Sequence, residues 1–499
     1  MAAAANHRFW VDMCLECVRQ DHTDAPGDQT GPFRSARAMG MALAAPHEVN
    51  ALAAGLPPLM ALAPEPGLVG LSTAQLEVAC CAACCEVLKL RYPHQAALLD
   101  PAWLYWLQSS GYSLSENAVS KAETAGRLVG RAIDRLGADD AQFAAGDMYS
   151  PSGLPYTHAA PPNQPRQGFA GADWGFVNYL LTQRVAGFPP PPGRCSATEV
   201  EDTQHFRDDF AKVQAKGGLN RGPAPMGRSD DEEFIGIAWG YDGPPKLGTP
   251  PRLYMQAVLS VLDRLAQAPA PAPRLTLAQE LELIAGVGLA MAEAGIDAWY
   301  YKYAPTHMMW RPAVGIPRAE AGNGVADPRF FPLGRPDTNK RGLALTPDFP
   351  AYPSGHATFG AAAFQVLRLY LVHKGLARFD ADGTDDVPLA FISDEFDGVN
   401  TDPRTQQPRP RRPVTNPSLW QAIVDNSVSR VYLGVHWQFD GLTRRNAETR
   451  SDEFEPDPAA LVPRLLGRTG GVWLGAQIAG QVARRLGVPQ TVIEDSRLA

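Results

Sequence analysis

The chain has 499 residues, of which 45% are apolar and 20% are charged, a composition typical of an ordinary folded protein. Its formal net charge of −8 argues against nucleic acid as a partner, because a surface that binds the phosphate backbone is basic. No uninterrupted apolar stretch reaches the length of about 20 residues that a membrane-spanning helix needs, so we expect no membrane partner either.

The N-terminal sequence and the cysteines bear on the cellular compartment. Residues 1–12 lack the basic region and apolar core of a signal peptide, so a cytoplasmic location is the default, with secretion without an evident signal left open. The odd number of cysteines, seven, suits a reducing compartment better than a disulfide framework. Six of them lie close together in the N-terminal sequence: Cys14, Cys17, Cys80, Cys81, Cys84 and Cys85. They show neither four convergent metal ligands nor a thioredoxin-like context, so we expect small buried helix residues.

Helical periodicity dominates the chain, and no run with the two-residue period of a strand stands out. Five segments carry the helical pattern: 76–92, 117–136, 276–303, 354–374 and 419–432. Thr276 and Gln279 form a capping box, which predicts where the third of these helices begins. The sequence therefore predicts an all-α protein.

Prolines separate the helical segments. The proline run 189–192, followed by Gly193, is a stiff break, and we place a domain boundary near it. This divides the chain into an N-terminal helical bundle, 1–200, and a C-terminal helical bundle, 201–499. The segment 402–417 is rich in proline and arginine and lies directly before a predicted helix, so we expect a loop near the mouth of the active site.

Two segments of the C-terminal half each place an oxyanion-binding group beside a histidine. The first is Ser354-Gly355-His356, at the start of a predicted helix, where unpaired N–H groups and the helix dipole favour negative charge. The second places Arg430 six residues before His436. A guanidinium matches a tetrahedral oxyanion bidentately. The histidine could bond to the ion's central atom, covalently or as a metal ligand.

A third basic segment lies upstream and contains Lys302 and Arg311, nine residues apart. On a regular helix this spacing puts the two side chains half a turn out of phase, and Pro305 also argues against a regular helix there. Either a bulge brings Lys302 to the same ion as Arg311, which we favour, or His307 faces the ion instead. Burying a multiply charged anion requires several fixed cations and donors, which the three segments together supply.

These segments resemble the signature of the vanadium-dependent haloperoxidases, specifically the chloroperoxidase branch. This family shares its anion site with type 2 phosphatidic acid phosphatases and class A acid phosphatases. The resemblance extends over roughly residues 235 to 480 and is densest in three stretches: 241–252, 349–360 and 426–440. It implies two four-helix bundles, with the anion site in the C-terminal one. In the chloroperoxidases the upstream lysine and arginine are seven residues apart, so this chain departs from the pattern there.

The resemblance implies vanadate as cofactor, with the Nε2 atom of His436 bonded to vanadium. Its oxygens would be held by six further residues: Lys302, Arg311, Ser354, Gly355, His356 and Arg430. The catalytic residues would be His356, His436, Lys302 and Asp242. His356 would be the acid–base catalyst, with an imidazole near its unperturbed pKa of about 6.5. Asp242 would pair with Arg430, and Asp440, four residues after His436, would orient that ring.

The implied reaction oxidises chloride or bromide with hydrogen peroxide and transfers the halogen to an organic acceptor. Trp299 and Phe349 occupy the halide-side positions of the chloroperoxidase branch, although both could equally be core residues. Phosphate should compete for the site, and a homodimer is left open. The alternative is an acid phosphatase in which His436 is the nucleophile and forms a phosphohistidine.

Overall fold

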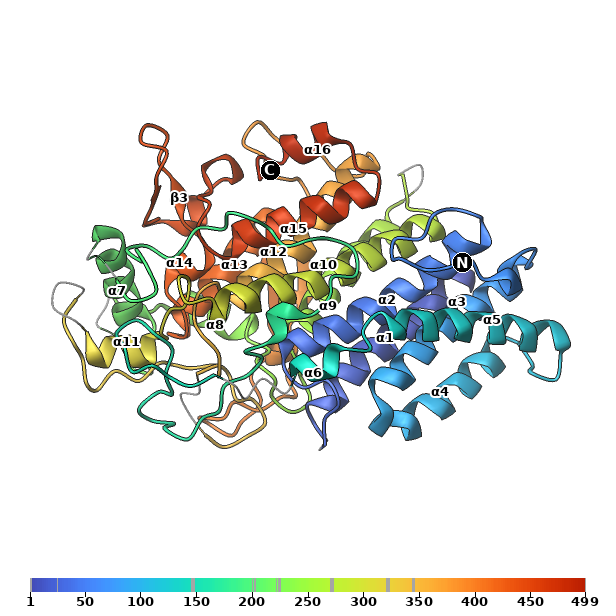
Figure 1. The fold of residues 1–499 in the computed structure, drawn as a ribbon, viewed down its shortest axis with the longest axis horizontal. Coiled ribbons are helices and arrows are strands. Elements are labelled where there is room, and N and C mark those ends of the chain that lie inside the picture. Colours follow the sequence, from blue (N-terminus) through green and yellow to red (C-terminus); the bar gives the residue numbers. More distant parts are fainter. Residues whose placement is uncertain are drawn as a thin grey trace.

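The computed structural model describes residues 2–498 except 25, 145–148, 200, 202, 221, 223–225, 270–272, 320–323 and 343–345. The fold is mostly helical, as predicted (Figure 1). Helices of the first 135 residues gather towards one end of an elongated molecule: α1 (Ala2–Asp21), α2 (Pro32–Ala53), α3 (Thr73–Arg91), α4 (Ala96–Ser109) and α5 (Asn117–Arg135). The short helix α6 (Asp140–Ala144) lies near the middle. Helix α3 packs between α2 and α5.

The rest of the chain forms the second helical region: α7 (Gln204–Lys216), α8 (Asp230–Ala238), α9 (Pro250–Gln267), α10 (Leu277–Tyr303), α11 (Pro312–Arg318), α12 (Gly355–His373), α13 (Leu419–Tyr432), α14 (Gln438–Gly441), α15 (Gly471–Arg485) and α16 (Gln490–Asp495). The five predicted helices are present with ends within three residues of those expected. The capping box is formed, since the Thr276 hydroxyl accepts from the Gln279 N–H and the Gln279 side chain accepts from the Thr276 N–H.

Two antiparallel ribbons were not expected from the sequence. Strand β1 (Leu389–Ile392) pairs with β2 (Pro413–Asn416), and β3 (Arg444–Arg445) pairs with β4 (Asp452–Glu453). Strands of two to four residues are too short to show a clear period. Because β2 lies within 402–417, this segment is partly sheet and not only a loop. None of it lines the large cavity described below, and its position near the mouth stays a prediction.

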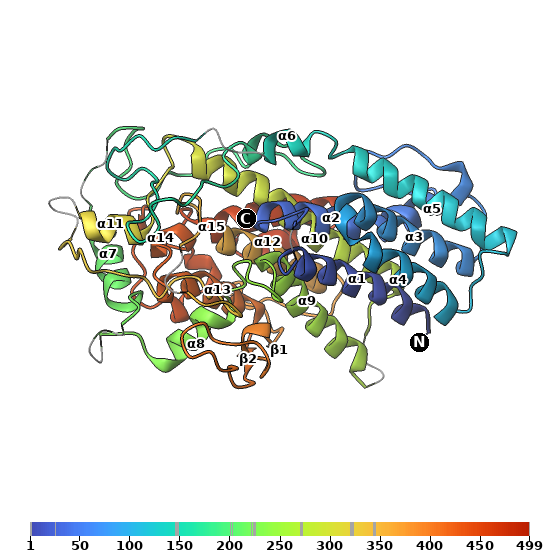
Figure 2. The ribbon, with the colours of Figure 1, turned by 90° about the horizontal axis from the view of Figure 1, so that it is seen from below.

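Helix α10 joins the two regions, because it packs on α2 at one side and on α12 and α15 at the other (Figure 2). Glycines allow the close approach of α2 to α10. A Cβ atom on Gly40 would lie 2.8 Å from the carbonyl oxygen of Gly288, so a larger side chain would push the helices apart. Since α10 belongs to both packings, the division at residue 200 stays a prediction.

The six clustered cysteines are buried, as predicted, on α1 and α3. Burial raises the pKa of their thiols, which keeps them protonated and unreactive. Within the described residues, every helix is too short or too polar to cross a bilayer.

Candidate active site

The start of α12 is tied directly to the segment that contains His436. Ser354 is the N-cap, and its hydroxyl accepts from the N–H of Ala357 at 3.4 Å. The Ser354 N–H donates to the carbonyl of Asp440 at 2.7 Å. The Ser354 hydroxyl can donate its proton to an anion, and N–H groups of the first turn of α12 favour an anion at the same place. Gly355 also lies against Trp299, since a Cβ atom there would be 3.3 Å from the indole ring.

His436 is held in one tautomer. Its Nδ1 donates to Asp440 Oδ2 at 2.9 Å, and the same carboxylate oxygen accepts from the Trp437 N–H at 2.9 Å. Nε2 therefore carries a lone pair, and it accepts from Arg311 Nη1 at 2.7 Å. Gly434 has φ +68° and provides the turn between Arg430 and His436. Burial, followed by the charges of Arg311 and Lys302, lowers the pKa of His436 well below its usual value, so the ring presents a neutral nitrogen with a lone pair to the site.

Two buried guanidiniums have unused donors. Arg311 donates from Nε to the Phe349 carbonyl at 2.9 Å and from Nη1 to the Val435 carbonyl at 2.8 Å. Its Nη2 has no hydrogen-bond partner among the described residues. Arg430 donates from Nη2 to Asp242 Oδ1 at 2.9 Å, and over the same residues its Nε and Nη1 are likewise unpartnered. Buried donors without partners are costly, so this arrangement fits an oxyanion that accepts from all three nitrogens.

Lys302, and not His307, reaches this site. Helix α10 ends at Tyr303, so a loop rather than a helical bulge spans the interval to Arg311. Lys302 is buried, and its Nζ donates to the carbonyls of Pro350 at 2.9 Å, Ala351 at 3.1 Å and Pro353. It therefore supplies positive charge beside the site while it holds the loop that leads into α12.

His307 points away from the anion site. Its Nε2 is 2.9 Å from the carbonyl oxygen of Phe188, and its ring stacks on the rings of Phe188 and Tyr352.

The pKa of Lys302 lies well below its usual value, mainly because the side chain is buried and secondly because of the positive charge of Arg311. A bound anion would oppose this shift, because it favours the charged amine.

His356 sits between the helix start and Asp242. Its Nε2 donates to the Gly240 carbonyl at 3.2 Å and lies 3.8 Å from Asp242 Oδ1. Burial, and then the charge of Arg430, lower the pKa of His356 well below its usual value. The pKa near 6.5 that we expected for His356 is therefore not confirmed. An anion bound among the surrounding cations would raise this pKa, because it would offset their charge.

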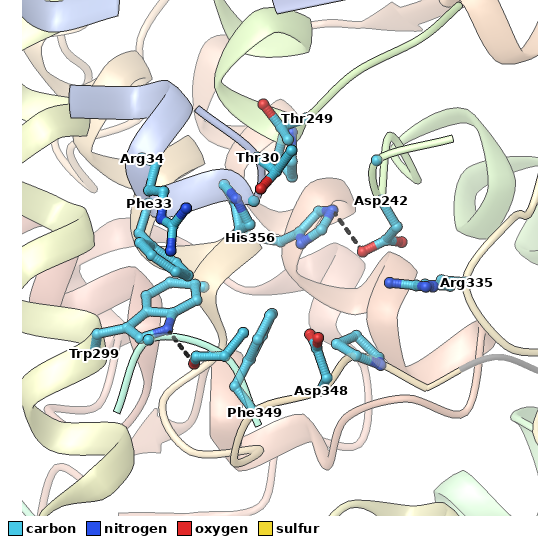
Figure 3. Close-up of a pocket in the computed structure, with 18 of the residues that line it drawn as sticks. Thr30, Phe33, Arg34, Asp242, Thr249, Trp299, Arg335, Asp348, Phe349 and His356 are labelled. Carbon is cyan, nitrogen blue, oxygen red and sulfur yellow. Dashed lines mark hydrogen bonds and ion pairs between the residues drawn. The ribbon is translucent and has the colours of Figure 1, made fainter. Parts of the chain in front are cut away.

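Trp299 and Phe349 form an aromatic wall beside the anion site (Figure 3). Their ring centroids are 4.7 Å apart, and Phe33 from the start of α2 packs on Trp299 at 4.8 Å. The Lys302 Nζ lies 5.1 Å from the Phe349 centroid and 5.5 Å from that of Trp299. The wall is thus apolar but adjacent to a cation.

A cavity of about 630 Å³ opens beside these residues, and both halves of the chain line it. Of the predicted residues, it exposes Asp242, Trp299, Phe349, Gly355, His356, Arg430 and His436, whereas Lys302, Arg311, Ser354 and Asp440 lie behind its wall. Sequence reasoning missed several lining residues: His22, Thr30, Phe33, Arg34, Arg335 and Asp348. Only Asp348 had a signal, its position directly before Phe349.

The comparisons with known proteins all found vanadium-dependent haloperoxidases. Residues 282–447 match the family model for the second helical-bundle domain of vanadium chloroperoxidase. A vanadium chloroperoxidase from Curvularia inaequalis is 29% identical over 95% of this chain and 88% of its own length. Among solved structures, a bacterial vanadium-dependent iodoperoxidase aligns with a TM-score of 0.62 at 18% identity, covering 95% of both chains. A holo-type bacterial vanadium-dependent chloroperoxidase aligns with a TM-score of 0.60 at 13% identity, covering 96% of both.

Proposed function

We propose that this chain, which belongs to the vanadium haloperoxidase family, oxidises chloride and bromide with hydrogen peroxide and halogenates organic acceptors. Its cofactor is vanadate. The observation that carries the proposal is the set of three buried, unpartnered guanidinium nitrogens, among the described residues, in a site where the lone pair of His436 Nε2 is directed at the Arg311 guanidinium. This donor set fits an oxyanion whose central atom accepts a nitrogen ligand.

The residues that would hold vanadate come from all three sequence segments. His436 Nε2 would bond to vanadium, with Asp440 keeping the ring in the required tautomer. The oxygens would be held by donors and charges of known position: Lys302, Arg311, Ser354, Gly355, His356 and Arg430. Asp242 fixes Arg430 through one oxygen, so that two guanidinium nitrogens stay directed elsewhere.

Bound vanadate supplies a Lewis-acidic centre that activates hydrogen peroxide toward halide without a change of oxidation state. His356 lies within the cavity wall with one ring nitrogen committed to the Gly240 carbonyl, so the other nitrogen is left to take up or release a proton. Lys302 contributes a positive field, since its three N–H groups are occupied by carbonyls.

The choice of chloride and bromide rests on the aromatic wall. Trp299 and Phe349 offer an apolar surface on which a halide is poorly solvated, and Lys302 lies within 5.5 Å of both ring centroids. Poor solvation makes a halide a better nucleophile. Since the relatives include both chloroperoxidases and an iodoperoxidase, halide preference has to be measured directly.

The deciding experiment is halogenation of a dimedone-type acceptor by purified protein, with hydrogen peroxide and chloride, bromide or iodide, before and after addition of orthovanadate. We expect activity that depends strictly on vanadate and is blocked by excess phosphate. No halogenation, together with vanadate-inhibited hydrolysis of an aryl phosphate, would instead establish the phosphatase in which His436 is the nucleophile.

A further inference from the structure

The cavity is larger than its inorganic reactants require. Vanadate, hydrogen peroxide and one halide together have fewer than ten heavy atoms and need on the order of 200 Å³, taking about 30 Å³ for each water-sized group. The cavity of about 630 Å³ has the size of a site for an organic ligand. Most of it is therefore space that an acceptor molecule could occupy next to the anion site.

The two sides of the cavity differ in chemistry (Figure 3). Phe33 and Trp299 lie on one side with Phe349 below them, and Arg335 and Asp242 lie on the opposite side, with the Arg335 guanidinium directed toward the centre. An aromatic ring packs well against the first side, and an anionic group would be attracted to the second.

Arg335 differs from the other arginines that line the cavity. Arg430 is paired with Asp242, and Arg34 donates to the carbonyl of Ala144. Within the part of the chain that the structure describes, the Arg335 side chain forms no hydrogen bond or ion pair and is partly exposed, although its charge is close enough to Asp242 to oppose the rise that burial causes in the pKa of that carboxyl. A guanidinium in this position can bind a carboxylate through two parallel hydrogen bonds.

Asp348 fixes the direction in which such a molecule would lie. Its carboxylate lines the cavity beside Phe349, so it repels an anion at the aromatic end. The other cavity carboxylate, Asp242, has one oxygen held by Arg430. The favourable orientation therefore puts a ring near Phe349 and the anionic group at Arg335.

We propose that the cavity binds an electron-rich aromatic acceptor that carries a carboxylate, such as a hydroxybenzoate, with Arg335 as the residue that selects it. This inference rests on the proposed haloperoxidase function for its chemistry. The overall reaction replaces an aryl C–H bond by a carbon–halogen bond: the arene, one halide, one hydrogen peroxide and one proton give the aryl halide and two waters. Hydrogen peroxide is reduced and the halogen is oxidised before transfer.

Binding tests the inference without any turnover. We would titrate 4-hydroxybenzoate by calorimetry into protein loaded with orthovanadate, without peroxide or halide, so that the anion site is already filled, and compare the wild type with Arg335→Gln. We expect affinity to fall about tenfold or more in the variant, as for the loss of a charge-assisted pair. Neutral 4-hydroxybenzamide should bind both proteins equally, which shows that the cavity is intact. Arg411→Gln, which removes the same charge from an exposed position outside the cavity, should bind 4-hydroxybenzoate like the wild type.

Equal 4-hydroxybenzoate affinity in the wild type and Arg335→Gln, or no binding to the wild type, would overturn the inference. A second measurement separates it from the proposed function. In one mixture with bromide and hydrogen peroxide, the vanadate-loaded enzyme should brominate 4-hydroxybenzoate over 4-hydroxybenzamide in a higher ratio than reagent hypobromite does, and Arg335→Gln should abolish this excess. A ratio equal to that of the reagent would mean that released hypobromite reacts in solution. No bromination of either acceptor would overturn the haloperoxidase, and the titration would still decide the acceptor site.

Discussion

The two halves of the molecule line the same cavity in different ways. The C-terminal half contributes polar groups whose types are dictated by an oxyanion: the Arg430 guanidinium, with Arg311 behind it, and the imidazoles of His356 and His436. The N-terminal half contributes mainly apolar surface, chiefly the Phe33 ring, which packs on Trp299. A site for a small ion tolerates few residue types, whereas many side chains can form a wall, so only the first kind of site leaves a recognisable sequence pattern.

The strongest test of the ion-binding half is His436→Ala. It removes the only nitrogen proposed to bond to vanadium and leaves Asp440 buried without its histidine partner. We expect vanadate affinity and halogenation both to fall by more than about 100-fold, since loss of second-shell partners alone costs 10- to 100-fold. Calorimetric titration with orthovanadate measures the first effect. Retained tight binding would contradict the coordination role.

His356→Ala should separate binding from turnover. The ring contacts Gly240 and Asp242 and adds no positive charge when neutral, so vanadate affinity should change little. Turnover should fall by about 100- to 10,000-fold, the usual contribution of a positioned acid–base group. The measurement is kcat for bromide oxidation at saturating vanadate. An unchanged kcat would exclude His356 as the acid–base catalyst.

The pair Lys302→Ala and His307→Ala tests the unusual spacing in the upstream segment. Lys302 lies beside the site and His307 contacts Phe188 instead. We therefore expect Lys302→Ala to weaken vanadate binding about tenfold or more, as for the loss of a buried charge interaction. His307→Ala should leave the affinity within about twofold, the size of a typical surface change. The reverse result would mean that the histidine reaches the ion.

The same segment shows what the sequence could and could not predict. Helix positions followed from periodicity and capping, and Ser354 and Thr276 cap the helices predicted to begin there. The route of the chain between Lys302 and Arg311 did not follow, because it depends on where α10 stops and on the carbonyls of 350–353 that hold the lysine. Arg335 gave no signal either, since its place in the cavity results from tertiary packing rather than from any local pattern.

Gly171→Ala should disturb the wall that the N-terminal half builds. Gly171 has φ +73°, and an added Cβ atom would lie 2.6 Å from the Trp299 ring and 2.8 Å from Phe33. We expect a loss of about 1–3 kcal/mol in the free energy of unfolding, from backbone strain and overpacking together. Gly187→Ala is the matched control, with φ +71° and no atom of the described residues within 4 Å of the added Cβ. Equal melting temperatures for the two variants would contradict the contact with Trp299.

The last prediction concerns the pH dependence of stability and involves Glu48 on α2, a carboxyl group of the N-terminal half whose pKa is set mainly by burial. Its Oε1 accepts from the N–H groups of Leu59 and Met60, and Oε2 has no partner in the described part of the chain. Burial raises the pKa of Glu48 from 4.5 to about 7. The folded state then holds a proton that the unfolded state has lost, so the free energy of unfolding falls as pH rises from 4.5 to about 7, by up to about 3 kcal/mol, and is level above.

Glu48→Gln should remove this pH dependence, because the amide oxygen can accept from the same two N–H groups and carries no charge to desolvate. Thermal midpoints at pH 5 and pH 8 measure the effect: the wild type should lose more stability between the two values than Glu48→Gln does. Glu448→Gln, on the exposed surface, should keep the wild-type decline. An identical decline in Glu48→Gln would mean that Glu48 is ionised in the folded protein over this pH range.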